Sequence, residues 1–153
     1  MPYLIDGHNL IPKIGLHLEN PDDEMELVRF LQEFARIKRQ QVEVYFDGAP
    51  AGYAGTRKLG TVKAHFISRG QTADSAIRAR LENMGNSAKN WTVVSSDHEV
   101  QRAARLNQAQ PITSEEFVRQ LRIALSSKTK TDEARQMSKT EVDEWLKLFG
   151  GKE

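Results

Sequence analysis

The chain of 153 residues contains no cysteine, which excludes disulfide bonds, thiolate catalysis and cysteine-ligated zinc or iron–sulfur clusters. It also has no apolar run of about eighteen residues and no basic segment leading into an apolar one, so we expect neither a membrane span nor a signal peptide. These absences predict a cytoplasmic protein without a membrane partner. With 39% hydrophobic and 28% charged residues, the chain has the composition of a soluble globular protein built on one domain.

The formal net charge of +1 hides an uneven distribution of charge along the chain. Residues 1–47 carry 5 basic and 9 acidic side chains, whereas residues 48–105 carry 9 basic and 4 acidic ones. A basic region that also contains carboxylates suits a polyanionic substrate held near a metal ion. A solvated surface of mixed charge would produce similar counts.

Apolar segments of strand length alternate with segments of helical periodicity. We expect strands at 3–5, 42–46, 62–67, 91–95 and 111–113, and helices at 22–39, 74–84, 97–106 and 114–125. The stretch around Pro12, Gly15 and Pro21 is expected to be irregular, and residues 48–60 to form a flexible basic loop. This order predicts an α/β domain of three layers over residues 1–126, with a mainly parallel central sheet of about five strands.

Residues 127–153 are predicted to lie outside this domain, as a polar linker and a short amphipathic helix. Ser126–Met137 is polar and rich in lysine, and Ser138–Glu141 matches a helix capping box. Apolar residues follow at helical spacing: Val142, Trp145, Leu146 and Phe149. This helix could dock a partner or a second copy of the chain, or it could cover the core of its own domain.

Four aspartates lie where a predicted strand meets a loop or a helix: Asp6, Asp47, Asp74 and Asp97. The carboxyl ends of parallel strands form one edge of a sheet, and ligands bind in the crevice there, so we expect these carboxylates to converge. Converging carboxylates suit a hard cation such as Mg²⁺ or Mn²⁺. Each aspartate alone could be a turn or helix-capping residue. The four together favour a metal site, because Ser, Thr, Asn and Gly would cap helices equally well.

Other kinds of site have weaker support in the sequence. The histidines His8, His65 and His98 lack the spacing of metal ligands such as His-x-x-x-His. The chain has no Gly-x-Ser-x-Gly nucleophile motif, no Gly-x-x-x-x-Gly-Lys-Ser/Thr loop and no Gly-x-Gly-x-x-Gly turn after a strand. These absences argue against a serine hydrolase, a P-loop nucleotidase and a dinucleotide-binding enzyme.

The segments around the four aspartates resemble the motifs of a known family. They are similar to those of the YacP-like branch of the NYN domains, within the PIN-like nuclease superfamily, and they occur in the same order: Asp6–Ile11, Val44–Gly48, Thr72–Ile77 and Val93–Asp97. The resemblance covers about residues 1–125. Each motif is short, but the ordered set of four is fairly specific.

This resemblance implies a PIN-like parallel sheet, an RNA-cleaving activity and an acidic metal centre formed by the four aspartates, with Asn9 as a supporting polar residue. Two positions depart from the family pattern. His8 stands where the family often has tyrosine, and Ser75 stands where many relatives carry a second acidic residue. The implied site is therefore one carboxylate poorer than in those relatives.

We therefore predict a metal-dependent endoribonuclease in which Mg²⁺ or Mn²⁺ polarises a phosphate oxygen and activates water. Single-stranded or messenger RNA is the expected substrate, with the ribosome as a further candidate partner. The residues predicted to bind RNA are Arg57, Lys58, Lys63, Arg69 and Tyr53. The basic residues could instead form a solvated surface, and Tyr53 could pack on the domain.

Two other functions are compatible with the same residues. A catalytically weak RNA-binding or ribosome-associated module could keep the fold without cleaving RNA. A small-molecule phosphohydrolase would usually need an Asp-x-Asp pair, which Asp6-Gly7-His8 does not supply.

Overall fold

The computed structural model of the chain describes residues 2–14, 21–50 and 52–133. Its strands are β1 (Tyr3–Asp6), β2 (Val42–Ala49), β3 (Gly55–Leu59), β4 (Val62–Ser68), β5 (Thr92–Val94) and β6 (Gln110–Ile112). Its α-helices are α1 (Gly7–Leu10), α2 (Pro21–Lys38), α3 (Ala73–Met84), α4 (His98–Leu106) and α5 (Ser114–Glu133). Two 3₁₀ helices, η1 (Ile11–Ile14) and η2 (Gly85–Asn90), complete the described elements.

The six strands form one sheet in the order β3-β4-β2-β1-β5-β6, in which only β3 is antiparallel to its neighbour. The central strand β1 pairs in parallel with both β2 and β5. The chain builds the sheet outward from β1 on one side and then returns to build the other side. A ligand crevice is expected outside the carboxyl ends of the strands at the point where this order reverses, between β1 and β5.

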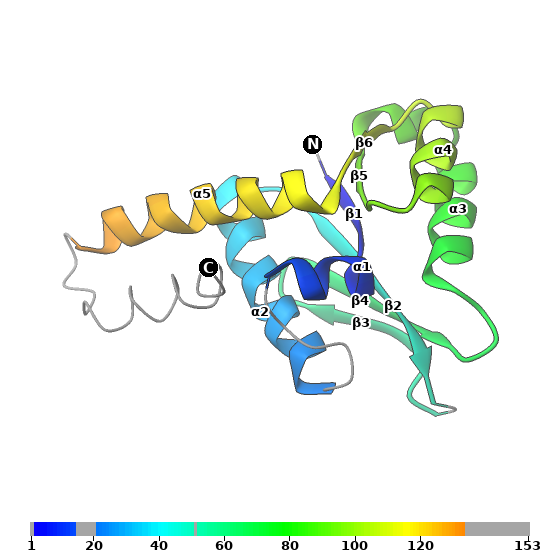
Figure 1. Cartoon of the computed structure of the whole chain (residues 1–153), viewed down its shortest axis with the longest axis horizontal. Helices are drawn as coiled ribbons and strands as arrows, with labels where there is room; N and C mark the ends of the chain where they lie inside the picture. The colour runs from blue at the N-terminus through cyan, green and yellow to red at the C-terminus, as the bar shows by residue number, and fades with distance from the viewer. Residues whose placement is uncertain (1, 15–20, 51, 134–153) are drawn as a thin grey trace.

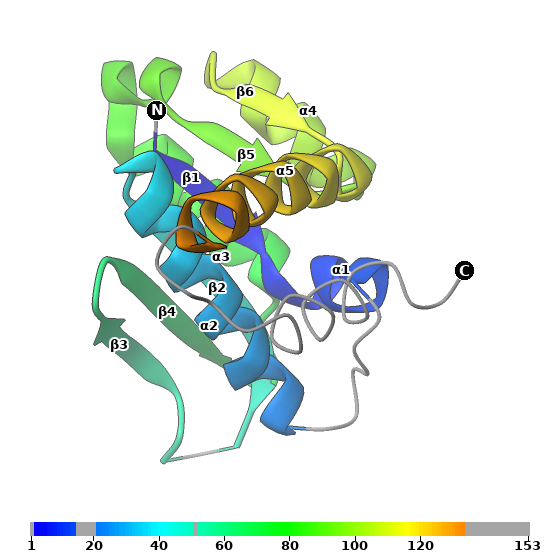
Figure 2. The same ribbon diagram turned by 90° about the vertical axis from the view of Figure 1, so that its left-hand side faces the viewer.

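Helices cover both faces of the sheet, which confirms the predicted three-layer α/β fold (Figure 1). Alternating residues of β1 enter different cores because successive side chains of a strand point to opposite faces. Ile5 packs in a core with α2 and α5, and Leu4 packs in a second core with α3 and α4. Figure 2 shows α5 lying across the face that α2 also covers, and their contact is formed by Phe34 and Phe117, whose rings lie 5.0 Å apart.

The described parts of two segments predicted to be irregular form regular structure. Residues 48–60 are not one loop: β2 extends through Ala49, and β3 forms a hairpin with β4 that turns at Gly60, where φ is +66°. The sheet therefore has six strands rather than about five. Edge strands are often charged and exposed, so β3 lacks the apolar alternation that marks an internal strand. The stretch around Pro12 forms the short helix α1 and the 3₁₀ turn η1 directly after β1.

Helix α5 begins where predicted but ends later. Its N-cap is Thr113, whose Oγ1 accepts a hydrogen bond from the Glu116 amide at 3.0 Å. It continues to Glu133, so the segment predicted to be a linker from residue 127 begins inside α5. The weak helix propensity of serine and threonine does not end a helix that has already formed. The predicted helix near Trp145 lies outside the described residues, and within them no helix is long and apolar enough to cross a membrane.

A buried ion pair joins β2 to α3. The Glu43 side chain is fully buried and accepts hydrogen bonds from Arg80 Nε and Nη2, at 3.2 and 2.9 Å. His65 Nε2 lies 3.2 Å from Glu43 Oε1, and the Tyr45 hydroxyl donates to the same oxygen at 3.3 Å. Burial alone would raise the pKa of Glu43, but the hydrogen bonds from His65 and Arg80 and the charge of Arg80 outweigh it and lower the pKa to about 2.

Replacing Arg80 with alanine is expected to leave the Glu43 carboxylate buried and undercompensated. We expect a loss of about 2–3 kcal/mol of unfolding free energy, less than the roughly 3–5 kcal/mol typical of a fully buried pair, because Arg80 is partly exposed. Urea unfolding at neutral pH measures this loss. Arg119→Ala, at an exposed ion pair with Glu116, is the matched control and should cost under about 1 kcal/mol.

The same pair predicts an acid-sensitive fold. The folded-state pKa of Glu43, about 2, lies below the ordinary value of 4.5, so its stabilisation is present above pH 4.5 and is lost as the pH falls toward 2. In Arg80→Ala this part of the pH dependence should be smaller than in the wild type. An identical pH dependence in both proteins would contradict the account.

Candidate functional site

Asp6 ends β1 at the carboxyl edge of the sheet, and the next residue brings the chain close to β2. A side chain added at Gly7 would place its Cβ 2.4 Å from the Phe46 ring and 2.9 Å from the Tyr45 carbonyl oxygen. Only glycine therefore permits this approach. Because Asp6 pairs in register with Tyr45, Asp47 lies just beyond Asp6 along the neighbouring strand. The two carboxylates thus share the carboxyl edge of the sheet.

The environment of Asp6 disfavours its negative charge. Burial is the main cause that raises the pKa of Asp6, and the negative charge of Asp47 raises it further, to about 6. The backbone N–H of Asn9 and the Ser95 hydroxyl, which donates to Asp6 Oδ2 at 3.4 Å, oppose this shift without cancelling it. A cation at this position would remove the repulsion between the two aspartates.

His8 lies between two carboxylates. Its Nδ1 is 2.9 Å from Asp47 Oδ1, and its Nε2 is 2.5 Å from Glu24 Oε2. Burial would lower the pKa of His8, but the hydrogen bonds to Glu24 and Asp47 outweigh burial and raise it. Only the protonated ring can donate from both nitrogens, so this geometry favours imidazolium.

Asp47 also fixes the start of α3. The backbone N–H of Ala73 donates to Asp47 Oδ2 at 3.2 Å, and Thr72 caps the helix by accepting from the Ser75 amide at 3.0 Å. This contact brings Asp74, in the first turn of α3, to the same edge of the sheet. Ser75, the next residue, is exposed.

Asp74 carries a buried oxygen without a hydrogen bond. Arg78 Nε lies 3.1 Å from Asp74 Oδ1, close enough for an ion pair but outside hydrogen-bonding geometry. Among the described residues, this is the one buried side-chain polar atom left without a hydrogen-bond partner. Buried oxygens are nearly always satisfied, so Asp74 Oδ1 is suited to a further ligand.

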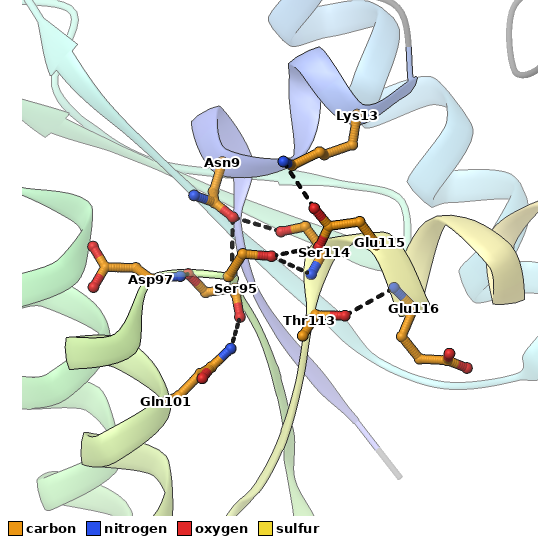
Figure 3. Close-up of polar contacts among 10 residues, drawn as sticks. Asn9, Lys13, Ser95, Asp97, Gln101, Thr113, Ser114, Glu115 and Glu116 are labelled. Carbon is orange, nitrogen blue, oxygen red and sulfur yellow. Dashed lines mark hydrogen bonds and ion pairs between the residues drawn. The ribbon is translucent and has the colours of Figure 1, made fainter. Parts of the chain in front are cut away.

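Asp97 differs from the other three aspartates. It is exposed, and its Oδ1 caps α4 by accepting a hydrogen bond from the Glu99 amide at 2.8 Å. Figure 3 shows its carboxylate pointing away from Asn9. Its backbone N–H donates to Ser95 Oγ at 3.0 Å, so Ser95 links the start of α4 to Asp6. Asp97 therefore lies near the edge as a helix cap.

Asn9, in the turn after β1, joins the ends of three strands at this edge (Figure 3). Its Oδ1 accepts hydrogen bonds from the Ser96 amide at 2.8 Å and from the Ser114 hydroxyl at 2.6 Å. These contacts hold the ends of β5 and β6 against the turn that follows β1. An amide oxygen has two lone pairs, and both are used here, so this oxygen is a structural clamp rather than an available metal ligand.

The four aspartates therefore share one edge of the sheet, but not as a set ready for a metal. Within the described part of the chain, no group of three or more His, Asp or Glu side chains is arranged to hold an ion. Besides Asp6, each aspartate already has a partner. Asp47 pairs with His8, Asp74 pairs with Arg78, and Asp97 accepts a hydrogen bond from the first turn of α4. The donor chemistry still fits a hard cation, because Asp6, Asp47 and Asp74 offer carboxylate oxygens and Asp74 Oδ1 is buried without a hydrogen bond.

The five residues predicted to bind RNA divide between the two ends of the hairpin. Arg57 stacks over Tyr53, with its guanidinium carbon 4.1 Å from the ring centroid, and Tyr53 contacts Phe66 edge-on at 5.3 Å. Phe66 stacks on Phe46, which contacts the His8 ring. Arg69 follows the carboxyl end of β4. Lys58 and Lys63 instead pair across the strands near the hairpin turn.

Sequence inspection did not identify several residues that build this edge. Glu24 lies near the start of a helix, where acidic residues are common, and its contact with His8 spans 16 positions. Ser96 donates to Glu115 Oε1 at 2.7 Å, and Lys13 forms an ion pair with Glu115 at 2.9 Å (Figure 3). Such contacts between distant segments leave no local pattern, because serine and glutamate are common at any helix start.

The mainly parallel sheet with helices on both faces and aspartates at its carboxyl edge is a PIN-like α/β domain. The chain belongs to the YacP-like NYN domain family, whose sequence model matches residues 3–148 and so extends past the predicted domain boundary at residue 126. No curated protein matched the chain in sequence.

Two crystal structures of Rae1 (YacP) from Bacillus subtilis are similar to this fold, each at 22% sequence identity. A mutant form gives a TM-score of 0.72 and covers 97% of this chain and 91% of that chain. The other structure gives a TM-score of 0.65 and covers 97% of this chain and 92% of that chain.

The clamp role of Asn9 predicts a specific pattern of stability. Asn9→Ala leaves the Ser96 amide and the Ser114 hydroxyl without their acceptor, which should cost roughly 1–3 kcal/mol of unfolding free energy. Asn9→Asp keeps an acceptor oxygen in the same place and should retain most of that stability. Urea unfolding of the two variants measures the difference, and equal losses in both would contradict the clamp.

Proposed function

We propose that the protein is a metal-dependent endoribonuclease that hydrolyses RNA phosphodiester bonds at the carboxyl edge of its sheet. The observation that carries this proposal is the pair of neighbouring carboxylates at the ends of β1 and β2, one of which has a pKa raised to about 6. Membership of the YacP-like NYN domain family supports a nuclease-type activity. RNA is the proposed substrate, and the ribosome is a further proposed partner.

Asp6, Asp47 and Asp74 would hold Mg²⁺ or Mn²⁺, with Asp97 as a more distant, exposed contributor. A bound ion of this kind supplies charge stabilisation at phosphate and a more acidic water. The surrounding residues position the carboxylates. His8 and the Ala73 amide orient Asp47, Ser95 orients Asp6, and the Asn9 clamp keeps the strand ends together.

The turn that carries Tyr53, between β2 and β3, supports the proposed binding of single-stranded RNA. Tyr53 is 40% exposed, and its ring is held by Arg57 and Phe66, so it presents a surface on which a base can stack. A line of ring contacts runs from Tyr53 through Phe66 and Phe46 to His8 beside Asp47. A base on Tyr53 would therefore place its neighbouring phosphates toward the carboxylates, with Arg69 available at the same edge.

A second candidate is an RNA-binding module that does not cleave. The engagement of Asp47 by His8 favours it, because His8 occupies an oxygen that a metal ion would use. RNA binding that is insensitive to a chelator, together with no cleavage in Mg²⁺ or Mn²⁺, would support this alternative.

Asparagine substitutions at the four aspartates test the proposed cleavage. We expect Asp6→Asn, Asp47→Asn and Asp74→Asn to lower metal-dependent cleavage of labelled single-stranded RNA by roughly a hundredfold or more. Asp97→Asn should give the smallest loss, since its carboxylate is exposed and asparagine caps a helix equally well.

Glu82→Gln is the control, because Glu82 is an exposed acidic residue later in α3. Cleavage that survives unchanged in all the aspartate variants would point to a contaminating nuclease and remove the assignment.

The exposed tyrosine predicts a second effect, on binding. Tyr53→Ala should weaken binding of single-stranded RNA by about 1–3 kcal/mol, the range for one stacked base. Tyr53→Phe keeps the ring and should bind nearly as well as the wild type. Fluorescence anisotropy in the presence of a chelator separates binding from cleavage. Equal binding by the alanine and phenylalanine variants would mean that Tyr53 only packs against the domain.

A further inference from the structure

A basic groove lies at the end of the sheet opposite the aspartates. Its volume is about 650 Å³, and one wall comes from the end of α2 and the turn after it, the other from the β3–β4 hairpin. Figure 2 shows the end of α2 and the turn between β3 and β4 on the same side of the molecule. The lining includes four basic residues and no acidic one: Arg36, Arg39, Lys58 and Lys63.

Ordinary helix electrostatics explains only part of this charge. Basic residues near the end of α2 complement the negative end of the helix dipole, and Arg36 also pairs with Glu33 at 2.8 Å. Lys58 and Lys63 come from a different element, where no dipole favours them, and they lie directly opposite each other across β3 and β4. Like charges in this position repel, so the pairing disfavours the fold unless an anion offsets it.

Three cations of the groove are available to a ligand: Arg39, Lys58 and Lys63. Among the described residues, no carboxylate lies within ion-pair distance of Arg39, Lys58 or Lys63. Arg39 also has φ of +56°, a left-handed conformation that glycine or asparagine usually occupies after a helix. Gln40, Gln41 and Thr61 add polar groups to the same lining. Arginine, lysine, glutamine and threonine side chains together are the usual contacts of a nucleic-acid phosphate.

We propose that this groove is a second RNA-binding site, which holds the phosphate backbone of the substrate at a distance from the aspartates. The inference rests on the proposed function for the identity of the ligand. Lys63 is near the start of β4 and Arg69 follows its end, so the rise of a strand places the two sites about 20 Å apart. A short oligonucleotide would reach only one of them, whereas a longer strand would reach both. The groove thus gives the protein a preference for extended RNA.

Salt dependence of binding tests this site. Arg39→Gln combined with Lys63→Gln removes one cation from each wall of the groove. Each lost phosphate contact on a single strand lowers the slope of log K against log salt by about 0.7, so the double variant should lose about 1.4. The measurement is fluorescence anisotropy with labelled single-stranded RNA of about 16 and about 4 nucleotides, in the presence of a chelator. The loss should be seen with the longer RNA and be small with the shorter one.

The control is Arg102→Gln combined with Arg105→Gln. Both residues are exposed on α4, so these substitutions remove the same amount of charge from another part of the surface. The salt slope of this control should equal that of the wild type. Equal slopes for the groove variant and the wild type, or equal losses in both double variants, would overturn the proposal. Displacement of the RNA by polyglutamate as effectively as by unlabelled RNA would also overturn it, because the groove would then be a general anion site.

A second pair of substitutions guards against misfolding. Lys58→Gln combined with Lys63→Gln lies wholly on the edge hairpin and relieves a like-charge pair, so the fold should be retained. The slope of log K against log salt should fall by a similar amount in this variant. An unchanged slope in the folded variant would contradict the proposal that the groove binds RNA. Because these binding measurements use a chelator, loss of the slope with no cleavage in metal would reject the nuclease and keep the groove. RNA cleavage in the presence of metal, without any change in the salt slope of the groove variant, would support the nuclease and reject the groove.

Discussion

Parallel pairing of β1 with both β2 and β5 is the constraint on which the candidate site depends. It brings the carboxyl ends of three strands to one edge and makes Asp6 and Asp47 neighbours. The approach requires glycine at position 7, because any Cβ there would meet the Phe46 ring. The Asn9 amide oxygen then fixes the ends of β5 and β6 against the same turn. Backbone geometry thus assembles the edge before any ligand is considered.

The same geometry forces like charges together, and the structure limits that cost in several ways. Burial and the charge of Asp47 raise the pKa of Asp6, while His8 and the start of α3 satisfy Asp47. On the α3 side of the sheet, the buried Glu43 is balanced by Arg80 and His65. The Glu43 network is fully paired, whereas the edge keeps an unsatisfied oxygen at Asp74. The one buried oxygen without a hydrogen bond among the described residues therefore lies at the edge where chemistry is proposed.

The sequence predicted the α/β class and the places of the aspartates, because apolar strands and helix starts have local patterns. It did not predict β3, whose exposed residues have no alternation, or the extension of α5 to Glu133. Local patterns left open whether each aspartate caps a helix; in the structure Asp97 is an exposed helix cap, and Asn9 holds the strand ends together. His8 and Glu24 were missed as partners because their contact depends on how α2 packs beside β2. Those interactions are set by tertiary structure rather than by any local motif.

The central claim is that Asp6, Asp47 and Asp74 together bind a divalent cation. Anomalous diffraction from a crystal soaked in Mn²⁺ tests it most directly, because the metal is located without reference to activity. We expect a manganese peak between these three carboxylates, with Asp74 Oδ1 among the ligands and the His8 ring moved away from Asp47. A crystal that binds manganese elsewhere and leaves this edge without a peak would contradict it.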